Sequence, residues 1–219
     1  SAAVPLGLMY IAAYLRNYFK DDIVIKIIDN RLYEYNEEQL YECIRDFEPS
    51  IVGISSKTVE AEDMYAAARA AKRFNRMTVV IAGGPHPTQY YDEVIMDRNI
   101  DALVLGEGEL TVLELVKNYM SGKGYDGVKG IVFLRDGQVV KTPAREPIPD
   151  LDLLLLAIST DLTAIGPEGC KWRTDRICLD EFRLVSASPQ GVRCSGSFLD
   201  RTERLVVSPE NGRLLRGSV

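Results

Sequence analysis

Short runs of aliphatic and β-branched residues alternate, along the first 120 or so residues, with stretches whose apolar residues recur every three or four positions. The runs predict strands over residues 23–28, 51–55, 78–82 and 102–105. The helical patterns occupy residues 8–18, 40–47, 64–74, 90–96 and 110–120. Strands and helices that alternate at this spacing form βαβ units and a mostly parallel sheet, and strands this apolar are covered on both faces. The sequence therefore predicts an α/β fold with helices on both faces of the sheet.

Beyond residue 122 the alternation stops. Residues 131–141 predict a β-hairpin, because Asp136-Gly137 is a preferred two-residue turn, and residues 143–152 are proline-rich, which is typical of a linker or strap. From about residue 159 periodicity is lost apart from short pieces such as residues 205–207, which leaves a functional loop, a disordered tail or a shifted reading frame as alternatives. We divide the chain into an α/β domain (1–122), a hairpin with linker (123–157) and an irregular tail (158–219).

Composition excludes several classes of partner. A net charge of −6 and a pI near 5.0 argue against a nucleic-acid partner, and no apolar run approaches the roughly 20 residues that a bilayer requires. Cysteines stand at positions 43, 170, 178 and 194, a spacing that forms no disulfide framework and favours a reducing cytoplasm. The last three are also too widely spaced for a compact iron–sulfur motif, and we predict no metal site in this chain.

Two glycine-rich turns, Ala82 to Thr88 and Leu105 to Glu109, each follow a predicted strand, and a hydroxyl-rich turn follows the strand at residues 51–55. The carboxyl ends of neighbouring parallel strands are where open α/β sheets bind ligands, and glycine lets backbone amides approach a ligand closely. Such a cleft suits a large, hydrogen-bonding ligand better than a bare phosphate; alternatively, the glycines only make tight turns. The candidate cofactor-binding residues are Ser55, Ser56, Thr58, Gly83, Gly84, Pro85, His86, Thr88, Gly106, Glu107, Gly108 and Glu109.

Individual side chains offer weaker signals for catalysis. His86 is the only histidine, and it has no sequence neighbours that would complete a zinc site or a catalytic triad, so a structural or ligand-touching role is favoured over a base or metal ligand. Glu107 and Glu109 are more consistent with holding backbone amides or a ligand hydroxyl than with acid–base catalysis. Asp29 is either a ligand contact or an ordinary turn residue. The phosphate-loop and Gly-x-Gly-x-x-Gly motifs are absent, and we assign no catalytic residue.

Five motifs occur in the order seen in the cobalamin-binding domain of class B radical-SAM enzymes, a group that includes methyltransferases and the anaerobic magnesium-protoporphyrin monomethyl ester cyclase type. They are Val4-Pro-Leu-Gly-Leu-Met-Tyr-Ile-Ala-Ala-Tyr-Leu15, Ile51-Val-Gly-Ile-Ser55, Ala82-Gly-Gly-Pro-His-Pro-Thr88, Gly106-Glu-Gly-Glu109 and Ile148-Pro-Asp-Leu-Asp152. The chain thus resembles this family over residues 4–157. The resemblance implies a Rossmann-like domain that holds cobalamin at the carboxyl edge of its sheet, with the nucleotide tail of the cofactor in the loops listed above.

Three departures from the family pattern qualify what the resemblance implies. Related chains begin with a strand before the Pro-Leu-Gly-Leu motif, whereas only Ser1 to Val4 precede it here. The Asp-x-His-x-x-Gly motif is absent, since Asp29-Asn-Arg31 has no histidine, so cobalt is expected to have no histidine ligand from it. The Cys-x-x-x-Cys-x-x-Cys triplet of the radical-SAM barrel is also absent, so the iron–sulfur cluster and S-adenosylmethionine belong to the implied full-length enzyme.

The resemblance implies a cobalamin-binding module, without catalytic activity of its own, of a radical-SAM methyltransferase or cyclase whose radical-SAM domain lies outside this chain. Two alternatives stay open at this point. One is a flavodoxin-like or receiver-like regulatory domain that binds a nucleotide or a phosphoryl group at the same edge. The other is an independent small-molecule enzyme that uses Glu107 or His86.

Overall fold

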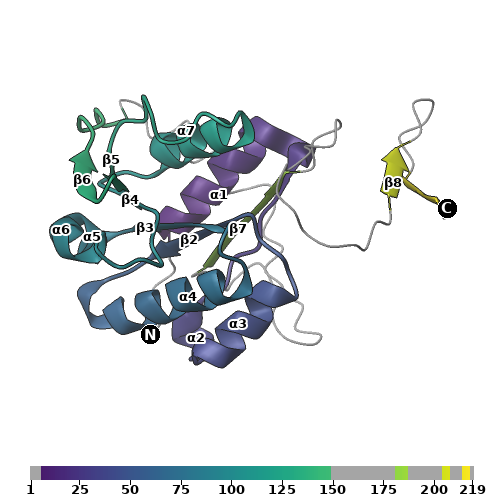
Figure 1. Ribbon diagram of the computed structural model, residues 1–219, viewed down its shortest axis with the longest axis horizontal. Helices are drawn as coiled ribbons and strands as arrows, with labels where there is room; N and C mark the ends of the chain where they lie inside the picture. Colours follow the sequence, from purple (N-terminus) through teal and green to yellow (C-terminus); the bar gives the residue numbers. More distant parts are fainter. Residues whose placement is uncertain (1–5, 149–180, 187–203, 208–213, 218–219) are drawn as a thin grey trace. The chain divides into compact units, whose positions relative to one another are not determined.

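The computed structural model describes residues 6–148, 181–186, 204–207 and 214–217, in two units (Figure 1). The first unit, Ser1–Ser186, contains a seven-stranded sheet, and the second, Ala187–Val219, contains an antiparallel pair of strands, β8 (Arg204–Val207) and β9 (Leu214–Gly217). The strands of the first unit are β1 (Ile23–Val24), β2 (Ile51–Ser55), β3 (Val79–Gly83), β4 (Ala102–Val104), β5 (Ile131–Arg135), β6 (Gln138–Lys141) and β7 (Glu181–Ser186).

The order of strands in this sheet is β1-β7-β2-β3-β4-β5-β6. The central strands β2, β3 and β4 are parallel neighbours, whereas β7 pairs antiparallel with both β1 and β2, and the β5–β6 hairpin adds antiparallel to β4. These pairings give one common direction to five strands, β1, β2, β3, β4 and β6. The strands β5 and β7 run in the opposite direction. The predictions of a mostly parallel open sheet and of a hairpin are therefore confirmed.

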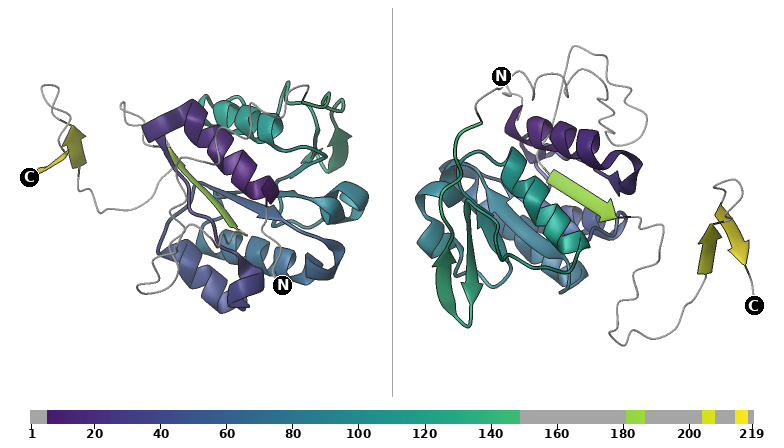
Figure 2. Two further views of the ribbon diagram at one scale, coloured as in Figure 1. Left: turned by 180° about the vertical axis from the view of Figure 1, so that it is seen from behind. Right: turned by 90° about the horizontal axis from the view of Figure 1, so that it is seen from above.

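Helices cover both faces of the sheet, as predicted (Figures 1 and 2). They are α1 (Leu6–Phe19), α2 (Asn30–Tyr33), α3 (Glu37–Arg45), α4 (Ala61–Phe74), α5 (Pro85–Gln89), α6 (Tyr91–Val94) and α7 (Glu109–Met120), with 3-10 turns η1 (Lys20–Asp22) and η2 (Thr58–Glu60). Side chains of β3 alternate between two cores: Ile81 packs in the cluster under α1 and α7, whereas Val80 and Ala82 pack in the cluster under α3 and α4. Small alanines of α4, such as Ala68, allow this helix to lie close to the sheet.

Two predicted elements differ from the structure, and the tail from residue 158, predicted to be irregular, contains the strands β7, β8 and β9. The predicted strand 23–28 forms ladder bonds only at Ile23 and Val24, because β7 pairs with these two residues alone, although Ile25 and Ile28 are still buried. The predicted helix 90–96 is replaced by two shorter helices, α5 and α6, of which α5 begins at Pro85, inside the first glycine-rich turn. Proline at the first helical position needs no amide partner, which explains this earlier start.

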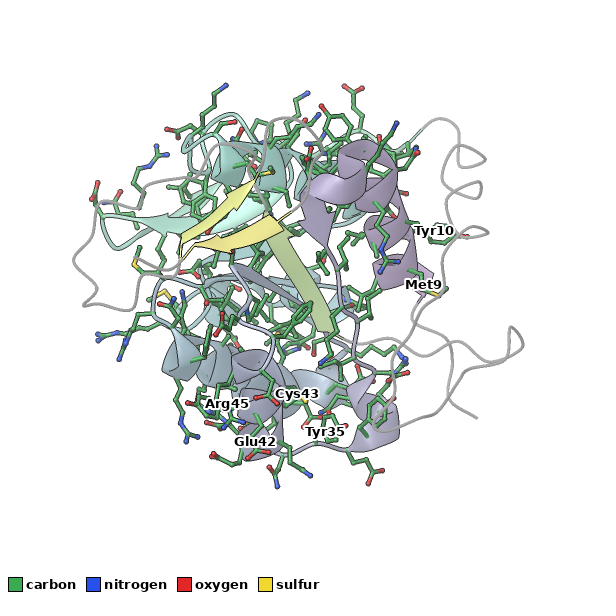
Figure 3. All side chains as sticks on the ribbon, turned by 90° about the vertical axis from the view of Figure 1, so that its right-hand side faces the viewer. Met9, Tyr10, Tyr35, Glu42, Cys43 and Arg45 are labelled. Carbon is green, nitrogen blue, oxygen red and sulfur yellow. The ribbon has the colours of Figure 1, made fainter. Side chains whose placement is uncertain are left out.

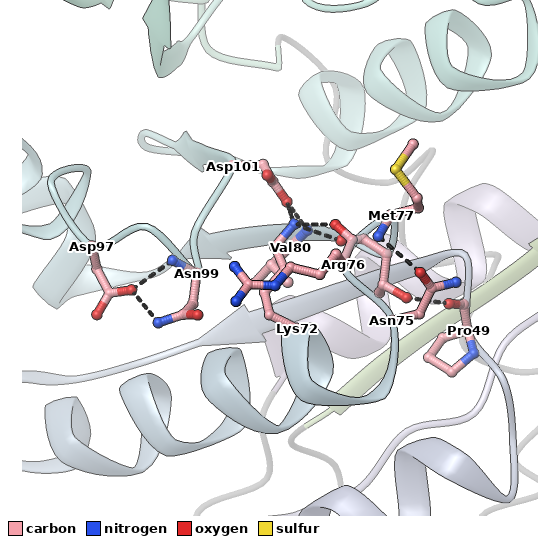
Figure 4. Close-up of polar contacts among 10 residues, drawn as sticks. Pro49, Lys72, Asn75, Arg76, Met77, Val80, Asp97, Asn99 and Asp101 are labelled. Atoms are coloured by element: carbon pink, nitrogen blue, oxygen red, sulfur yellow. Dashed lines mark hydrogen bonds and ion pairs between the residues drawn. The ribbon is translucent and has the colours of Figure 1, made fainter. Parts of the chain in front are cut away.

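The starts of β3 and β4 are joined by a partly buried polar network (Figure 4). Lys72 Nζ lies 2.5 Å from Asp101 Oδ2 and donates to the carbonyl of Thr78 at 2.7 Å. The same Asp101 oxygen accepts from the N–H of Val80 at 2.7 Å. Because this network satisfies both charges at the amino edge of the sheet, it fixes the register of β3 against β4 and thereby places their opposite, carboxyl ends.

The hairpin pairs with β4 through β5, and the proline-rich segment that follows it contacts α7. Asp136 and Gly137 both have positive φ, 52° and 76°, as a two-residue turn of this kind requires. The segment after β6 has no regular secondary structure up to Ile148, and Arg145 within it donates to Thr111 Oγ1 at 2.9 Å and pairs with Glu114. Residues 143–148 thus lie along the beginning of α7.

None of the helices formed by the described residues combines the length and apolarity that crossing a membrane requires. The division of the chain at residues 122 and 157 stays a prediction.

Candidate functional site

The carboxyl ends of β2, β3 and β4 open into one cavity of about 290 Å³, which α1 and α7 enclose from one face of the sheet. Its walls are mainly aliphatic side chains and glycine backbone, and among the described lining residues only Glu107 and Glu109 are charged. The lining residues are Gly7, Leu8, Ile11, Ile51, Gly53, Ile54, Ser55, Ile81, Gly83, Gly84, Val104, Gly106, Glu107, Gly108, Glu109 and Val112. The predicted turns therefore meet at a common cavity rather than at separate places.

The first glycine turn packs tightly against the loop after β2. Gly84 has φ 95°, and a Cβ at this position would stand 2.9 Å from the Ser56 carbonyl oxygen and 3.0 Å from Ser55 Oγ. The Ser56 N–H donates to the Gly83 carbonyl at 3.0 Å, and the His86 N–H donates to the Ser56 carbonyl at 3.1 Å. Only glycine at position 84 permits this approach, so the two loops form one rigid rim of the cavity.

The turn after β4 forms the opposite rim. Gly106 has φ 73° with open space around it, and its N–H lies 3.5 Å from the Thr88 hydroxyl, which connects this turn to α5. Gly108 keeps an ordinary φ of −91°, but a Cβ there would stand 2.7 Å from the end of the Ile11 side chain. The absence of a side chain at Gly108 therefore keeps space between α1 and α7.

Seven of the predicted cofactor-binding residues line this cavity: Ser55, Gly83, Gly84, Gly106, Glu107, Gly108 and Glu109. The other five lie in the same loops without lining it. The Ser56 hydroxyl is buried and donates to the Lys57 carbonyl, Thr58 is exposed at the start of η2, and Pro85, His86 and Thr88 belong to α5. Whether any of the twelve contacts a cofactor stays a prediction.

Glu107 and Glu109 lie in different environments although they are two residues apart. Glu107 is exposed and accepts a hydrogen bond from the Ile148 N–H at 3.1 Å, so it holds the end of the segment that follows β6, residues 143–148. Glu109 begins α7, is only 8% exposed, and its Oε2 is buried with no partner among the described residues. Burial raises the pKa of Glu109 above its ordinary value, the nearby charge of Glu107 adds to the rise, and the N–H groups of Glu109 and Gly108 oppose it.

The two remaining candidates make structural contacts. Asp29 is 1% exposed, caps α2 by accepting from the Arg31 N–H at 3.1 Å, and pairs with the Arg31 guanidinium. The His86 ring stacks at a tilt 5.1 Å from the ring of Tyr90, and its Nδ1 is buried without a partner. Asp29 therefore acts as a helix cap.

Among the described residues, no three histidine, cysteine or acidic side chains gather as a metal site. Cys43 lies on α3 near Tyr35 and Glu42, whereas α1, with Met9 and Tyr10, lies on the other side of the sheet (Figure 3). The predictions about Cys170, Cys178 and Cys194 fall outside the described residues.

Sequence reasoning about the turns missed the contribution of α1 and of the strand interiors. Gly7, Leu8 and Ile11 from α1 close the cavity, and Gly53 lines it from the middle of β2. Glycine inside a strand often marks a close approach by a ligand or another backbone, so Gly53 carried a usable signal. Nothing in the local pattern of α1 distinguishes its cavity-facing residues from ordinary core residues.

Comparisons with known proteins agree with this geometry. Residues 1–116 match the profile of the family described as "B12 binding domain". An uncharacterised methyltransferase from Pyrococcus horikoshii is 37% identical over 160 residues, which cover 68% of this chain and 34% of the relative. The anaerobic magnesium-protoporphyrin IX monomethyl ester cyclase of Rubrivivax gelatinosus is 35% identical over 153 residues, 68% of this chain and 27% of the relative. The chain thus spans about a third or less of the length of these relatives.

Among solved structures, the radical S-adenosylmethionine methyltransferase TsrM from Kitasatospora setae, with cobalamin and a 4Fe-4S cluster bound, aligns with a TM-score of 0.57 at 18% identity. The alignment covers 66% of this chain and 29% of TsrM, and at this identity it supports the shared Rossmann-like fold. The predicted resemblance, and cobalamin as the cofactor of the family, are confirmed by the family profile, which also disfavours the flavodoxin-like, receiver-like and independent-enzyme alternatives. This chain belongs to the B12 binding domain family.

Proposed function

We propose that this chain is the cobalamin-binding module of a radical-SAM methyltransferase or cyclase, and that the cavity at the carboxyl edge holds the nucleotide tail of the cofactor. The observation that carries the proposal is the convergence of three glycine- and serine-bearing turns on one apolar cavity in a chain of this family. Apolar walls suit a flat aromatic base, and the backbone of Gly83, Gly84 and Gly106 offers polar groups at the mouth.

The residues that line the cavity fit such a tail, but the Asp29–Arg31 segment provides no histidine ligand for the cobalt. Position 31 of the Asp29-Asn-Arg31 segment is an arginine that pairs with Asp29, so we expect no histidine from this segment on the cobalt. When bound, cobalamin supplies a cobalt centre that carries a methyl group or assists radical chemistry. The residues of this chain bind and orient the cofactor, and the apolar walls exclude water from its buried part.

The remaining parts of the function extend the proposal to the whole enzyme. We propose that a radical-SAM domain, outside the described residues, provides the iron–sulfur cluster and S-adenosylmethionine. By analogy with the relatives, we propose that the substrate of the whole enzyme is a methyl acceptor or a porphyrin precursor. The acidic charge supports a small-molecule rather than a nucleic-acid partner, and the cysteine spacing supports a reducing cytoplasm.

The test is retention of hydroxocobalamin by the purified chain after desalting, read from the visible spectrum. We expect wild type to keep the coloured cofactor and Gly108→Leu to lose it, because the leucine would fill the space between α1 and α7. Ser121→Leu is the matched control: both positions flank α7 with αR backbone, at φ −91° and −96°, but Ser121 is exposed at the far end. A colourless wild-type eluate, or equal retention by Gly108→Leu, would reject the proposed site.

A further inference from the structure

Glu109 is a buried acid with an unsatisfied oxygen in an otherwise apolar cavity. The residue is more than nine-tenths buried, its Oε2 has no hydrogen-bond partner in the described part of the chain, and it lines the proposed cofactor cavity. No lysine, arginine or histidine is among the described residues that line this cavity, so no cationic side chain among them compensates a negative charge at Glu109. An unpaired buried carboxylate is expensive, and the usual outcome is that the group takes up a proton.

Most of the groups around Glu109 favour the protonated form of its carboxyl. Glu107, two residues away, is the other titratable group among the lining residues, and it carries a like charge. The facing residues from α1, β2, β3 and β4 are uncharged. The N–H groups at the beginning of α7 favour the ionised form, but burial raises the pKa of the carboxyl despite them.

We propose that Glu109 is a neutral carboxylic acid that donates a hydrogen bond to an uncharged acceptor, a ring nitrogen or an oxygen, in the nucleotide tail of the bound cofactor. The proposal rests on the proposed function. A protonated carboxyl has one O–H donor, and Oε2 is the atom that lacks a partner in the described structure. A polar donor at the end of an apolar cavity fixes the orientation of an aromatic ligand and rejects ligands without an acceptor there. Glu109 is thus a positioning and specificity residue.

The binding test uses Glu109→Gln, which stays neutral and keeps an N–H donor, and Glu109→Leu, which has no donor. With hydroxocobalamin, we expect Glu109→Leu to bind about tenfold more weakly than wild type, the effect of one buried hydrogen bond, and Glu109→Gln to bind within about threefold. Cobinamide, which lacks the nucleotide tail, should bind all three proteins equally. Equal affinity of wild type and Glu109→Leu for hydroxocobalamin would overturn the proposal, and so would an equal loss with cobinamide.

The pH dependence provides a second readout. The affinity of wild type for hydroxocobalamin should fall as the pH rises through the pKa of Glu109, because the donor is then lost. Any pH effect on the ligand itself is removed by comparison with Glu109→Gln, whose side chain does not titrate. Identical pH profiles for the two proteins would contradict the proposed protonation.

A third readout requires no ligand. A carboxyl whose pKa is raised by folding stabilises the folded state when the pH is below the pKa of the unfolded chain, near 4.5. This stabilisation is lost as the pH rises through the pKa of the folded state. In urea unfolding between pH 5 and 8, wild type should therefore lose stability relative to Glu109→Gln. Glu62→Gln is the matched control, since Glu62 also lies in the first turn of a helix, but its side chain is 83% exposed. If the unfolding free energies of wild type and Glu109→Gln differ by a constant amount from pH 5 to 8, Glu109 is ionised and the proposal is overturned.

These readouts separate the two proposals. If wild type retains hydroxocobalamin and Glu109→Leu binds equally well, the module stands and the role of Glu109 falls. If wild type does not bind hydroxocobalamin, the proposed function and the ligand of Glu109 both fall, and the unfolding series still decides the protonation of the acid.

Discussion

Gly84 adopts φ 95° and ψ −174°, a region of backbone space that is nearly exclusive to glycine. The same residue lies against the Ser56 backbone, where any side chain would approach an oxygen to 2.9 Å. One residue therefore carries two separate constraints, one on the conformation of its own backbone and one on the distance between the loops after β2 and β3.

We predict that Gly84→Ala destabilises the first unit by about 2–4 kcal/mol, from backbone strain plus the clash with Ser56. Gly106→Ala is the control for strain alone, because Gly106 also has positive φ, 73°, but open space around it, and we expect it to cost about 1–2 kcal/mol. Urea unfolding followed by circular dichroism measures both values. If the two variants lose the same stability, the packing of Gly84 against Ser56 is not tight.

At the scale of elements, β7 occupies the position between β1 and β2 and is the one partner that joins these strands. Its backbone pairs Leu184 with Ile51 and Ser186 with Ile23. In this sheet a segment that begins 130 residues after the start of β2 in sequence, β7, pairs between β1 and β2. The identity of the strand at this position is therefore set by pairing and not by proximity in sequence.

We predict that Leu184→Pro, which removes one amide of β7 and disrupts its ladder, increases amide hydrogen exchange in β2 on the side that faces β7. Leu215→Pro in β9 is the matched control, because it breaks a strand of the second unit, where Leu215 pairs with Val206. Peptide-level exchange over residues 51–55 gives the measurement. Unchanged protection of these amides in Leu184→Pro would show that β7 does not stabilise β2.

At the scale of the whole molecule, the two units are expected to respond differently to the cofactor. A ligand that binds only the folded state raises the free energy of unfolding by about 2.7 kcal/mol when its concentration is 100 times Kd. We therefore predict that hydroxocobalamin stabilises the first unit, which contains the cavity, by this amount in thermal or urea unfolding. The Gly108→Leu variant should show no such gain. A similar gain in that variant would place the ligand elsewhere.

The fold and the turns were largely predictable because both depend on local signals. The apolar runs, the helical periodicity around residues such as Leu40 and Ile44, and the Asp136-Gly137 turn each report on one segment at a time. The glycine turns were found for the same reason, since glycine at Gly84 and Gly106 is required by local backbone geometry. The short extent of β1 was not predictable, because it depends on how far a distant strand pairs with it.

By itself, the sequence determined the alternation of strands and helices, the positions of the glycine turns and the family to which the chain belongs, because periodicity and motif order are properties of the chain in one dimension. Only the tertiary structure decided that α1 closes the cavity and that β7 lies between β1 and β2. It also decided that Glu109 is buried with Oε2 unsatisfied by the described residues, whereas Glu107 is exposed and accepts from the Ile148 N–H. Burial and pairing depend on residues far apart in sequence, and two glutamates separated by a single glycine acquire different chemistry from what packs around them.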